Sequence, residues 1–214
     1  MNCLIYVVPL EEEEAFISVL IFIMSSPWKW LHKPLYINQI FSSSLVEDLF
    51  IKRIVCINCK LDLVTTSNKC TNCTNERLAT IFDSLQETIF TQTYDRLSKT
   101  IASYREVFTR KQFDDEINDI VYNINYKTLR ESNPDPFISI LLHLDGIGLS
   151  ESTNQCWWIL SSSIIELPPA IRTRRQNNLI RSMWIANEQP NIELWLKQCF
   201  YQLMELKRKG NNSI

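Results

Sequence analysis

Two pairs of cysteines constrain the fold of this chain more than any other feature of its sequence. Cys56 and Cys59 form the first pair, and Cys70 and Cys73 form the second pair after a spacer of ten residues. A spacing of two residues lets one tight turn present both sulfurs to a single ion, at about 2.3 Å for zinc. The spacer is long enough to form a small hairpin that brings the two pairs face to face. The sequence therefore predicts a closed structural zinc site, with no open position for catalysis.

Other readings of the cysteines stay open at this point. The chain has seven cysteines, and an odd count with two close pairs is typical of a reducing compartment rather than of a secreted disulfide scaffold. An iron–sulfur cluster, a redox pair or four unconnected core cysteines would also use these residue types. Zinc is favoured because four thiolates satisfy its tetrahedral preference, and because no thioredoxin-like βαβ pattern surrounds either pair.

Charge and glycine content exclude several ways of binding nucleic acids or nucleotides. The net charge is −2 and the sequence pI is about 5.8, so no global positive field attracts nucleic acid. The chain has only three glycines and no glycine-rich phosphate loop. Contact with DNA would need a local basic patch, for which Arg172, Arg174 and Arg175 are the candidates; the alternative is a solvated loop.

The N-terminal segment, residues 1–49, is apolar and aromatic. Its stretch Ala15 to Met24 is about half as long as the ~20 residues that cross a bilayer. Glu11 to Glu14 precede it, where a signal peptide would have basic residues. We expect a short buried helix or strand and no membrane span, with a membrane-associated segment as the alternative. Leu45 to Ile51 is predicted to form a short helix.

The middle of the chain divides into two predicted regions. Residues 50–75 form the zinc-binding module, with a short strand over Leu61 to Thr66. Residues 76–132 form a helical linker region with three helices. The first helix is expected from Leu78 to Phe90 after Asn75 as its N-cap, because its apolar residues recur at helical spacing. The other two are expected over 94–108 and 113–129.

Residues 133–214 are predicted to be rich in strands. Apolar runs bounded by prolines and turn residues predict strands at 137–144, 156–165 and 178–186, which short connections should join as an antiparallel meander. A final helix follows Pro190. The expected fold class is therefore α+β: a four-cysteine zinc knuckle or ribbon, a helical segment, and a three-stranded antiparallel sheet with a C-terminal helix.

Several motifs in this region, in order, resemble a known family. The run from Phe137 to Leu149, which contains Asp145, resembles the "LTLNTDGV" strand of transposase-domain-containing proteins, eukaryotic relatives of the CACTA-type transposases. The stretch ending at Leu129 resembles the family's approach to that strand, and the cysteine pairs fall where the family carries a cysteine module. Further similar motifs follow in the family's order: Trp158-Ile-Leu, Glu166-Leu-Pro-Pro169, Ile180-Arg-Ser-Met-Trp184 and Gln189-Pro-Asn191.

The resemblance implies a partial RNase H-like core over residues 133–214. Asp145 would be the remnant of its first metal-binding acid, and Mg²⁺ would bind only if missing sequence completed the site. Glu166 and Glu188 do not match the family's other acids. The resemblance thus implies a truncated transposase derivative that has lost DNA transposition, or a half-enzyme completed by another chain.

Two functions follow as expectations. The first is a transposase-derived zinc-binding protein, catalytically inactive, that retains binding to DNA or to another protein chain. The alternative is a zinc-dependent protein-interaction module with no role on nucleic acid. We expect an intracellular, nuclear protein, and no small-molecule substrate is evident from the sequence.

Overall fold

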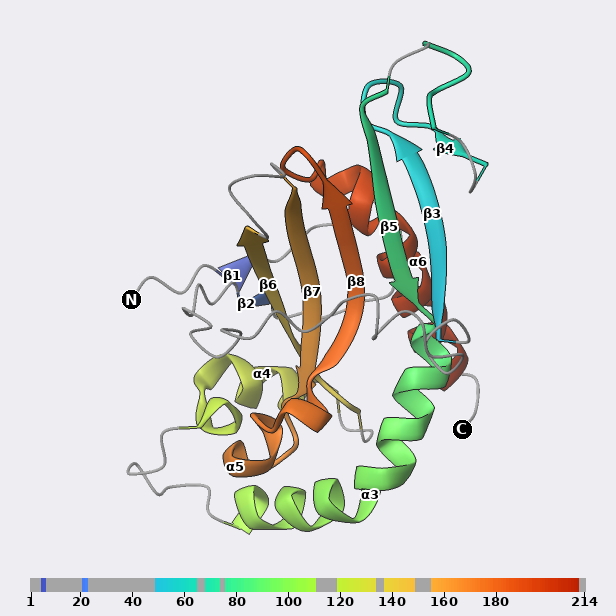
Figure 1. Cartoon of the computed structure of the whole chain (residues 1–214). Helices are drawn as coiled ribbons and strands as arrows, with labels where there is room; N and C mark the ends of the chain where they lie inside the picture. The colour runs from blue at the N-terminus through green and yellow to red at the C-terminus, as the bar shows by residue number, and fades with distance from the viewer. Residues whose placement is uncertain are drawn as a thin grey trace. The chain divides into compact units, whose positions relative to one another are not determined.

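A computed structural model describes residues 5–6, 21–22, 49–64, 68–73, 76–110, 119–133, 137–148 and 155–211 (Figure 1). Eight strands lie in these ranges: β1 (Ile5–Tyr6), β2 (Ile21–Phe22), β3 (Phe50–Cys56), β4 (Asp62–Leu63), β5 (Leu78–Ser84), β6 (Ile140–Gly148), β7 (Cys156–Ile164) and β8 (Leu179–Ala186). The helices are α3 (Gln86–Arg110), α4 (Ile124–Ser132), α5 (Pro169–Arg172) and α6 (Ile192–Asn211), with short 3-10 turns at Ile120–Tyr122 and Arg175–Asn177.

Six of the strands form one antiparallel sheet. Their order is β4-β3-β5-β8-β7-β6, so strands from both halves of the chain are neighbours in it. The ladder between β3 and β5 is seven residue pairs long, from Phe50 opposite Ser84 to Cys56 opposite Leu78. β5 pairs on its other side with β8, from Thr80 opposite Ile185 to Asp83 opposite Ser182. The short strands β1 and β2 pair with each other.

The helix predicted over Leu78 to Phe90 is wrong in its first half. Residues 78–84 form strand β5, and helix α3 begins only at Gln86. Burial alternates from Leu78 to Asp83, where Ala79, Ile81 and Asp83 are buried and the residues between them are partly exposed; this is the period of a strand. Residues 78–84 form a strand because they pair with β3 on one side and β8 on the other. Burial between these two strands outweighs the local helical propensity of the segment.

Other local predictions differ in smaller ways. The short helix expected over Leu45 to Ile51 is wrong at Phe50 and Ile51, which begin β3, and its first residues lie outside the described ranges. The strand expected over Leu61 to Thr66 is β4, with two residues. The helix expected over 94–108 is part of α3, which has 25 residues. The helix expected over 113–129 is confirmed in part: its described residues form a 3-10 turn and then α4, which continues to Ser132.

The strands and helix predicted for residues 133–214 are confirmed. Strands β6, β7 and β8 are consecutive in the sheet, and α6 follows them. Helix α4 ends at Ser132, the last residue of the predicted helical region. The final helix, α6, begins two residues after Pro190, as the sequence predicted. The apolar stretch Ala15 to Met24 lies outside the described residues except for Ile21 and Phe22 in β2. None of the described helices is long and apolar enough to cross a bilayer.

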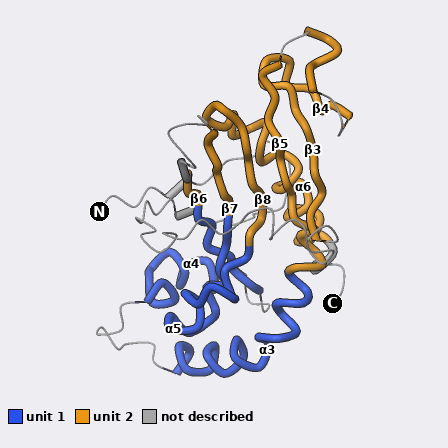
Figure 2. The backbone as a smooth tube through the Cα atoms, in the orientation of Figure 1, with its two compact units in different colours: residues 1–23, 90–143, 161–179 blue, residues 24–89, 144–160, 180–214 orange. Residues whose placement is uncertain are grey.

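The chain divides into two compact units, each built from separate stretches of sequence (Figure 2). Unit 1 comprises residues 1–23, 90–143 and 161–179. Its core has two clusters of buried residues. The first is built around Phe108, Tyr126 and Leu141, where the rings of Phe108 and Tyr126 meet edge to face. The second joins Leu97 of α3 with Ile164 and Leu167.

Unit 2 comprises residues 24–89, 144–160 and 180–214. Helix α6 packs against β5 and lies behind the strands in Figure 1. Trp184 of β8 and Trp195 of α6 are both fully buried, and their ring centroids are 6.5 Å apart. These two rings anchor the helix on the sheet. Unit 2 also contains all four cysteines of the predicted zinc module.

Candidate metal centre

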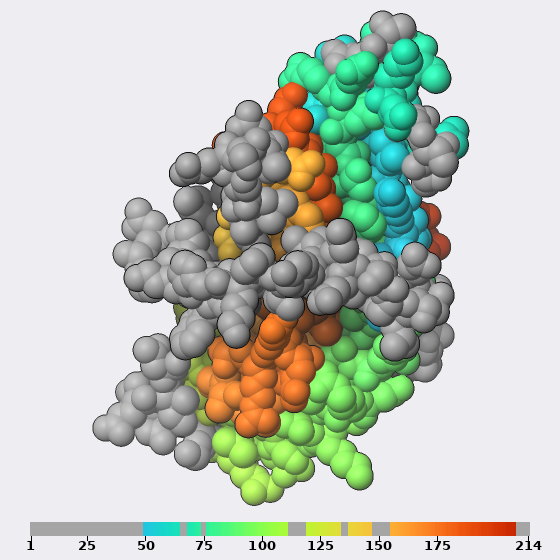
Figure 3. All heavy atoms as spheres, viewed as in Figure 1, coloured from blue at the N-terminus to red at the C-terminus, as the bar shows by residue number. Residues whose placement is uncertain are grey.

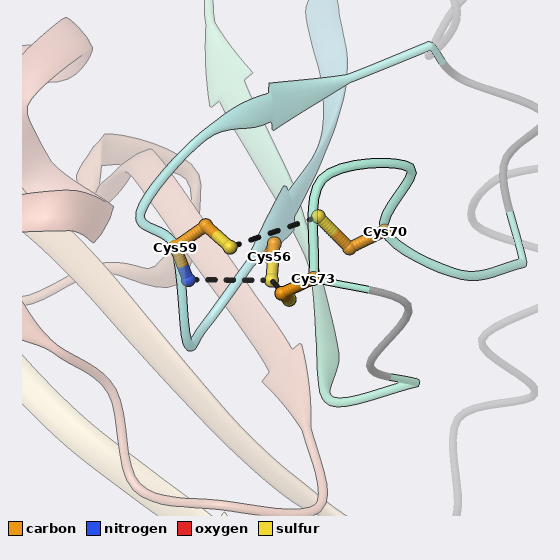
Figure 4. A group of neighbouring side chains, drawn as sticks. All are labelled: Cys56, Cys59, Cys70 and Cys73. Atoms are coloured by element: carbon orange, nitrogen blue, oxygen red, sulfur yellow. Dashed lines mark hydrogen bonds between the residues drawn. The ribbon is translucent and has the colours of Figure 1, made fainter.

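The ends of two paired strands bring the cysteines together. Cys56 is the last residue of β3, and Cys59 lies in the turn that follows. Cys70 and Cys73 lie in the segment before β5, which returns antiparallel to β3. Figure 4 shows the four side chains pointing toward one another from these two turns. A long strand ladder thus closes at one end on four sulfurs.

Two of the separations between the sulfurs match the edges of a tetrahedral site. The Sγ atoms of Cys56 and Cys73 are 3.6 Å apart, and those of Cys59 and Cys70 are 3.9 Å apart. All four sulfurs lie within 4.8 Å of one another. A tetrahedron with metal–sulfur bonds of about 2.3 Å has edges of about 3.8 Å, whereas a disulfide requires about 2.05 Å. The four cysteines can therefore hold a metal ion, and they are free thiols in this geometry.

Backbone and side-chain donors point at the same sulfurs. The amide of Cys59 donates to Cys56 Sγ over 3.4 Å, and Asn72 Nδ2 donates to Cys59 Sγ over 3.6 Å. Such donors stabilise a thiolate more than a thiol. Lys60 closes the first turn by donating its amide to the carbonyl of Cys56, over 2.9 Å. Its φ of 58° lies in the left-handed region, which costs a residue other than glycine about 1 kcal/mol or more. The turn around the first pair imposes this conformation.

The four cysteines differ in burial, and their ability to bind a metal ion depends on whether their thiols are protonated. Cys56 and Cys70 are buried, whereas Cys59 and Cys73 are partly exposed. A hydrogen bond with the Cys73 thiol, with burial and Cys70 adding to it, raises the pKa of Cys59 to about 12. A metal ion binds the thiolate forms, so its binding displaces protons from this cluster. The hairpin residues that carry the cluster form an exposed surface, coloured cyan to green in Figure 3.

An ion pair ties the second cysteine turn to the strand on the far side of β5. Arg77, which leads into β5, pairs through two nitrogens with the Glu188 carboxylate, just beyond β8. The Arg77 carbonyl also accepts from the amide of Ile57, over 3.0 Å, inside the first cysteine turn. The Glu188 carbonyl accepts from the Trp184 indole over 3.2 Å. Backbone and side chain of Arg77 therefore link both cysteine turns to the sheet.

Comparison with known proteins adds no relative to this description. No family model, curated protein or solved structure matches the chain. The resemblance to transposase-domain-containing proteins therefore stays a prediction. What the geometry supports directly is a cluster of four cysteines able to bind one metal ion.

Asp145 lies in strand β6 and is not part of any group of three or more potential metal ligands among the described residues. The four cysteines are the one cluster of three or more potential metal-ligating side chains among the described residues. Burial raises the pKa of Asp145 above its usual value, and a hydrogen bond that its carboxylate accepts from the Gly146 backbone amide opposes this shift. Gly146 itself is needed for close packing, since a Cβ there would lie 3.0 Å from the Trp158 ring.

The three arginines proposed to contact phosphate occupy different environments. Arg172 is buried: it donates to both oxygens of Asp119, over 2.6 and 3.0 Å, and to the carbonyls of Ile165 and Leu167. Its guanidinium is therefore occupied within unit 1. Arg174 and Arg175 are exposed and, with Gln176, line a wide shallow cavity of about 610 Å³. The structure leaves these two as the accessible members of the predicted patch.

Glu166 and His143 have polar partners in the structure that no sequence pattern indicated. Glu166 is fully buried and accepts hydrogen bonds from the Tyr126 hydroxyl, over 2.9 Å, and from the Ser139 amide. Burial raises its pKa. His143 Nε2 lies 3.2 Å from Ser163 Oγ, and burial lowers its pKa. Their partners are 20 to 40 residues away in the chain, beyond the reach of any local pattern.

Proposed function

We propose that this chain is a zinc-binding protein in which Cys56, Cys59, Cys70 and Cys73 hold one structural Zn²⁺. The observation that carries the proposal is the separation of the sulfurs, 3.6 and 3.9 Å, against about 3.8 Å for an ideal tetrathiolate site. Zinc is preferred over other ions because four soft thiolates in a tetrahedron suit it. All four positions are filled by protein, so the ion would stabilise the hairpin rather than perform chemistry.

The chain around this site is proposed to be a catalytically inactive derivative of a CACTA-type transposase. Support comes from the ordered motifs of the sequence together with the order β6, β7, β8, α6, which agrees with the strands and helix expected for a partial RNase H-like core. Among the described residues Asp145 belongs to no group of three or more potential metal ligands, which favours loss of two-metal chemistry. We further propose nuclear localisation and residual binding to DNA or to another protein chain.

Two assays test catalysis and DNA binding separately. The full chain, loaded with zinc, is incubated with duplex DNA and Mg²⁺ or Mn²⁺, beside an Asp145→Asn variant. No cleavage by either protein is expected, and cleavage that the variant abolishes would overturn the inactive assignment. Binding of a duplex is then measured over a range of salt concentrations. Phosphate contacts by Arg174 and Arg175 would give an affinity that falls steeply with salt.

A zinc-dependent protein-interaction module is the second candidate, and one observation favours it. The buried ion pair of Arg172 with Asp119 removes one cation from the predicted basic patch. With a net charge of −2, the chain then has little to attract a polyanion. No measurable DNA binding at low salt, by a chain that carries zinc, would support this candidate over the first.

A further inference from the structure

One side chain links the cysteine hairpin to the interior of unit 2. Arg53 lies in β3, three residues before Cys56. Its guanidinium donates through Nε to Asp83 of β5 over 2.8 Å, through Nη1 to Asp62 of β4 over 2.9 Å, and through Nη2 to the Trp195 carbonyl of α6 over 3.3 Å. The side chain is only 16 % exposed. Arg53 therefore joins β4, β5 and α6 at a single point.

The interior end of this link is held firmly. Asp83 is fully buried and also accepts a hydrogen bond from the Ser182 hydroxyl, over 2.7 Å. Ser182 Oγ in turn accepts from the Trp195 indole, over 2.8 Å. Burial raises the pKa of Asp83, and the contacts with Ser182 and Arg53 oppose this shift. These contacts fix the position of the Arg53 guanidinium from the inside.

The outer end of the link belongs to the segment between the two cysteine pairs. Asp62 lies three residues after Cys59, and its side chain is 66 % exposed. Its strand, β4, is joined to β3 by only two residue pairs, Ile54 opposite Leu63 and Val55 opposite Asp62. So short a ladder holds a strand weakly. The ion pair with Arg53 ties this segment to the buried network.

We propose that Arg53 and Asp62 are positioning residues for the metal centre. Their ion pair holds the segment between the cysteine pairs in its metal-binding arrangement, so that less ordering is required when the ion binds. The proposal rests on the zinc function proposed above. An ion pair that served only the stability of the fold would affect folding alone. Loss of Arg53 or Asp62 is instead expected to weaken metal binding as well.

Competition with a chelator of known zinc affinity tests the proposal on the full reduced chain. Asp62→Asn is the main variant, because it keeps the shape of the side chain and leaves Arg53 paired with Asp83. We expect its zinc Kd to rise about three-fold, within the range typical of exposed ion pairs, with a smaller effect at high salt. Glu76→Gln is the matched control. Glu76 is the other acid of residues 50–77 and forms no ion pair with described residues. The zinc Kd of this control should therefore stay within about 1.5-fold of wild type.

A double-mutant cycle then shows whether the two residues act as a pair. Arg53→Lys should also weaken zinc binding, and adding Asp62→Asn to it should change the Kd little further. Thermal unfolding of zinc-loaded and metal-free protein supplies the second readout: Asp62→Asn should lower Tm of the zinc-loaded form more than that of the metal-free form. Equal losses in both forms, or a Kd no different from Glu76→Gln, overturn the proposal. A wild-type chain that binds no zinc overturns the zinc function itself, which is a separate result.

Discussion

Replacing Arg172 by methionine should lower the free energy of unfolding severely, because this arginine belongs to a buried ion pair. Its guanidinium is not accessible to DNA, so the substitution measures folding and not DNA binding. Arg172 and Asp119 are 7 % and 3 % exposed, and two hydrogen bonds join them. Without the guanidinium, Asp119 keeps only the Ile120 amide and the Tyr104 hydroxyl as donors. The carbonyls of Ile165 and Leu167 also lose their donor. Breaking a buried pair from one side costs about 3–5 kcal/mol, a large share of the ~5–15 kcal/mol that stabilises a typical domain.

Urea unfolding followed by circular dichroism measures this effect. With a slope of about 2–3 kcal/mol per molar urea, the midpoint of Arg172→Met should fall by about 1–2 M. Arg174→Met and Arg175→Met are the matched controls and should stay within about 0.5 kcal/mol of wild type, because both side chains are exposed. Adding Asp119→Asn to Arg172→Met should recover part of the loss. A loss below about 1 kcal/mol for Arg172→Met would refute the reasoning.

Three further predictions concern protonation and packing. Zinc affinity should fall at least about tenfold for each pH unit below neutrality, because binding must displace protons from thiols such as Cys59, whose pKa is raised to about 12; chelator competition at several pH values checks this. Glu166→Gln keeps an acceptor for Tyr126 but removes a carboxylate with a raised pKa. In wild type, the Glu166 carboxyl ionises at lower pH in the unfolded chain than in the folded chain, so stability should fall as pH rises through the folded pKa. The variant has no such carboxyl, so its urea midpoint should not show this fall. Gly146→Ala should cost about 1 kcal/mol and shift tryptophan emission, because the new Cβ meets the Trp158 ring at 3.0 Å.

The features that the sequence predicted well are those encoded locally. Two residues between cysteines suffice to define a metal-binding turn, so Cys56 and Cys59 could be assigned to a site without any tertiary information. The strands β6, β7 and β8 are apolar runs bounded by turn residues, and their short connections leave few ways to pair them. Helix α6 carries a broad apolar face that includes the buried Trp195 and Cys199.

The features that the sequence did not reveal depend on distant partners. The apolar residues of 78–90 fit a helical period as well as a strand period, and only the neighbours β3 and β8 decide for a strand at 78–84. Arg53 and Asp83 are 30 residues apart, and Arg172 and Asp119 are 53 residues apart. No local pattern marks such pairs, so Arg172 could be placed in a basic patch although the fold buries it. Burial of charged residues is set by tertiary packing.

Native mass spectrometry of the reduced full chain tests the central claim most directly. Wild type and the Cys156→Ser control, which alters a cysteine outside the cluster, should each carry one zinc ion per chain. A variant with Cys56→Ser and Cys70→Ser, which removes the two buried ligands, should carry none. An unmetallated wild-type chain, or equal zinc content in the double variant, would contradict the account.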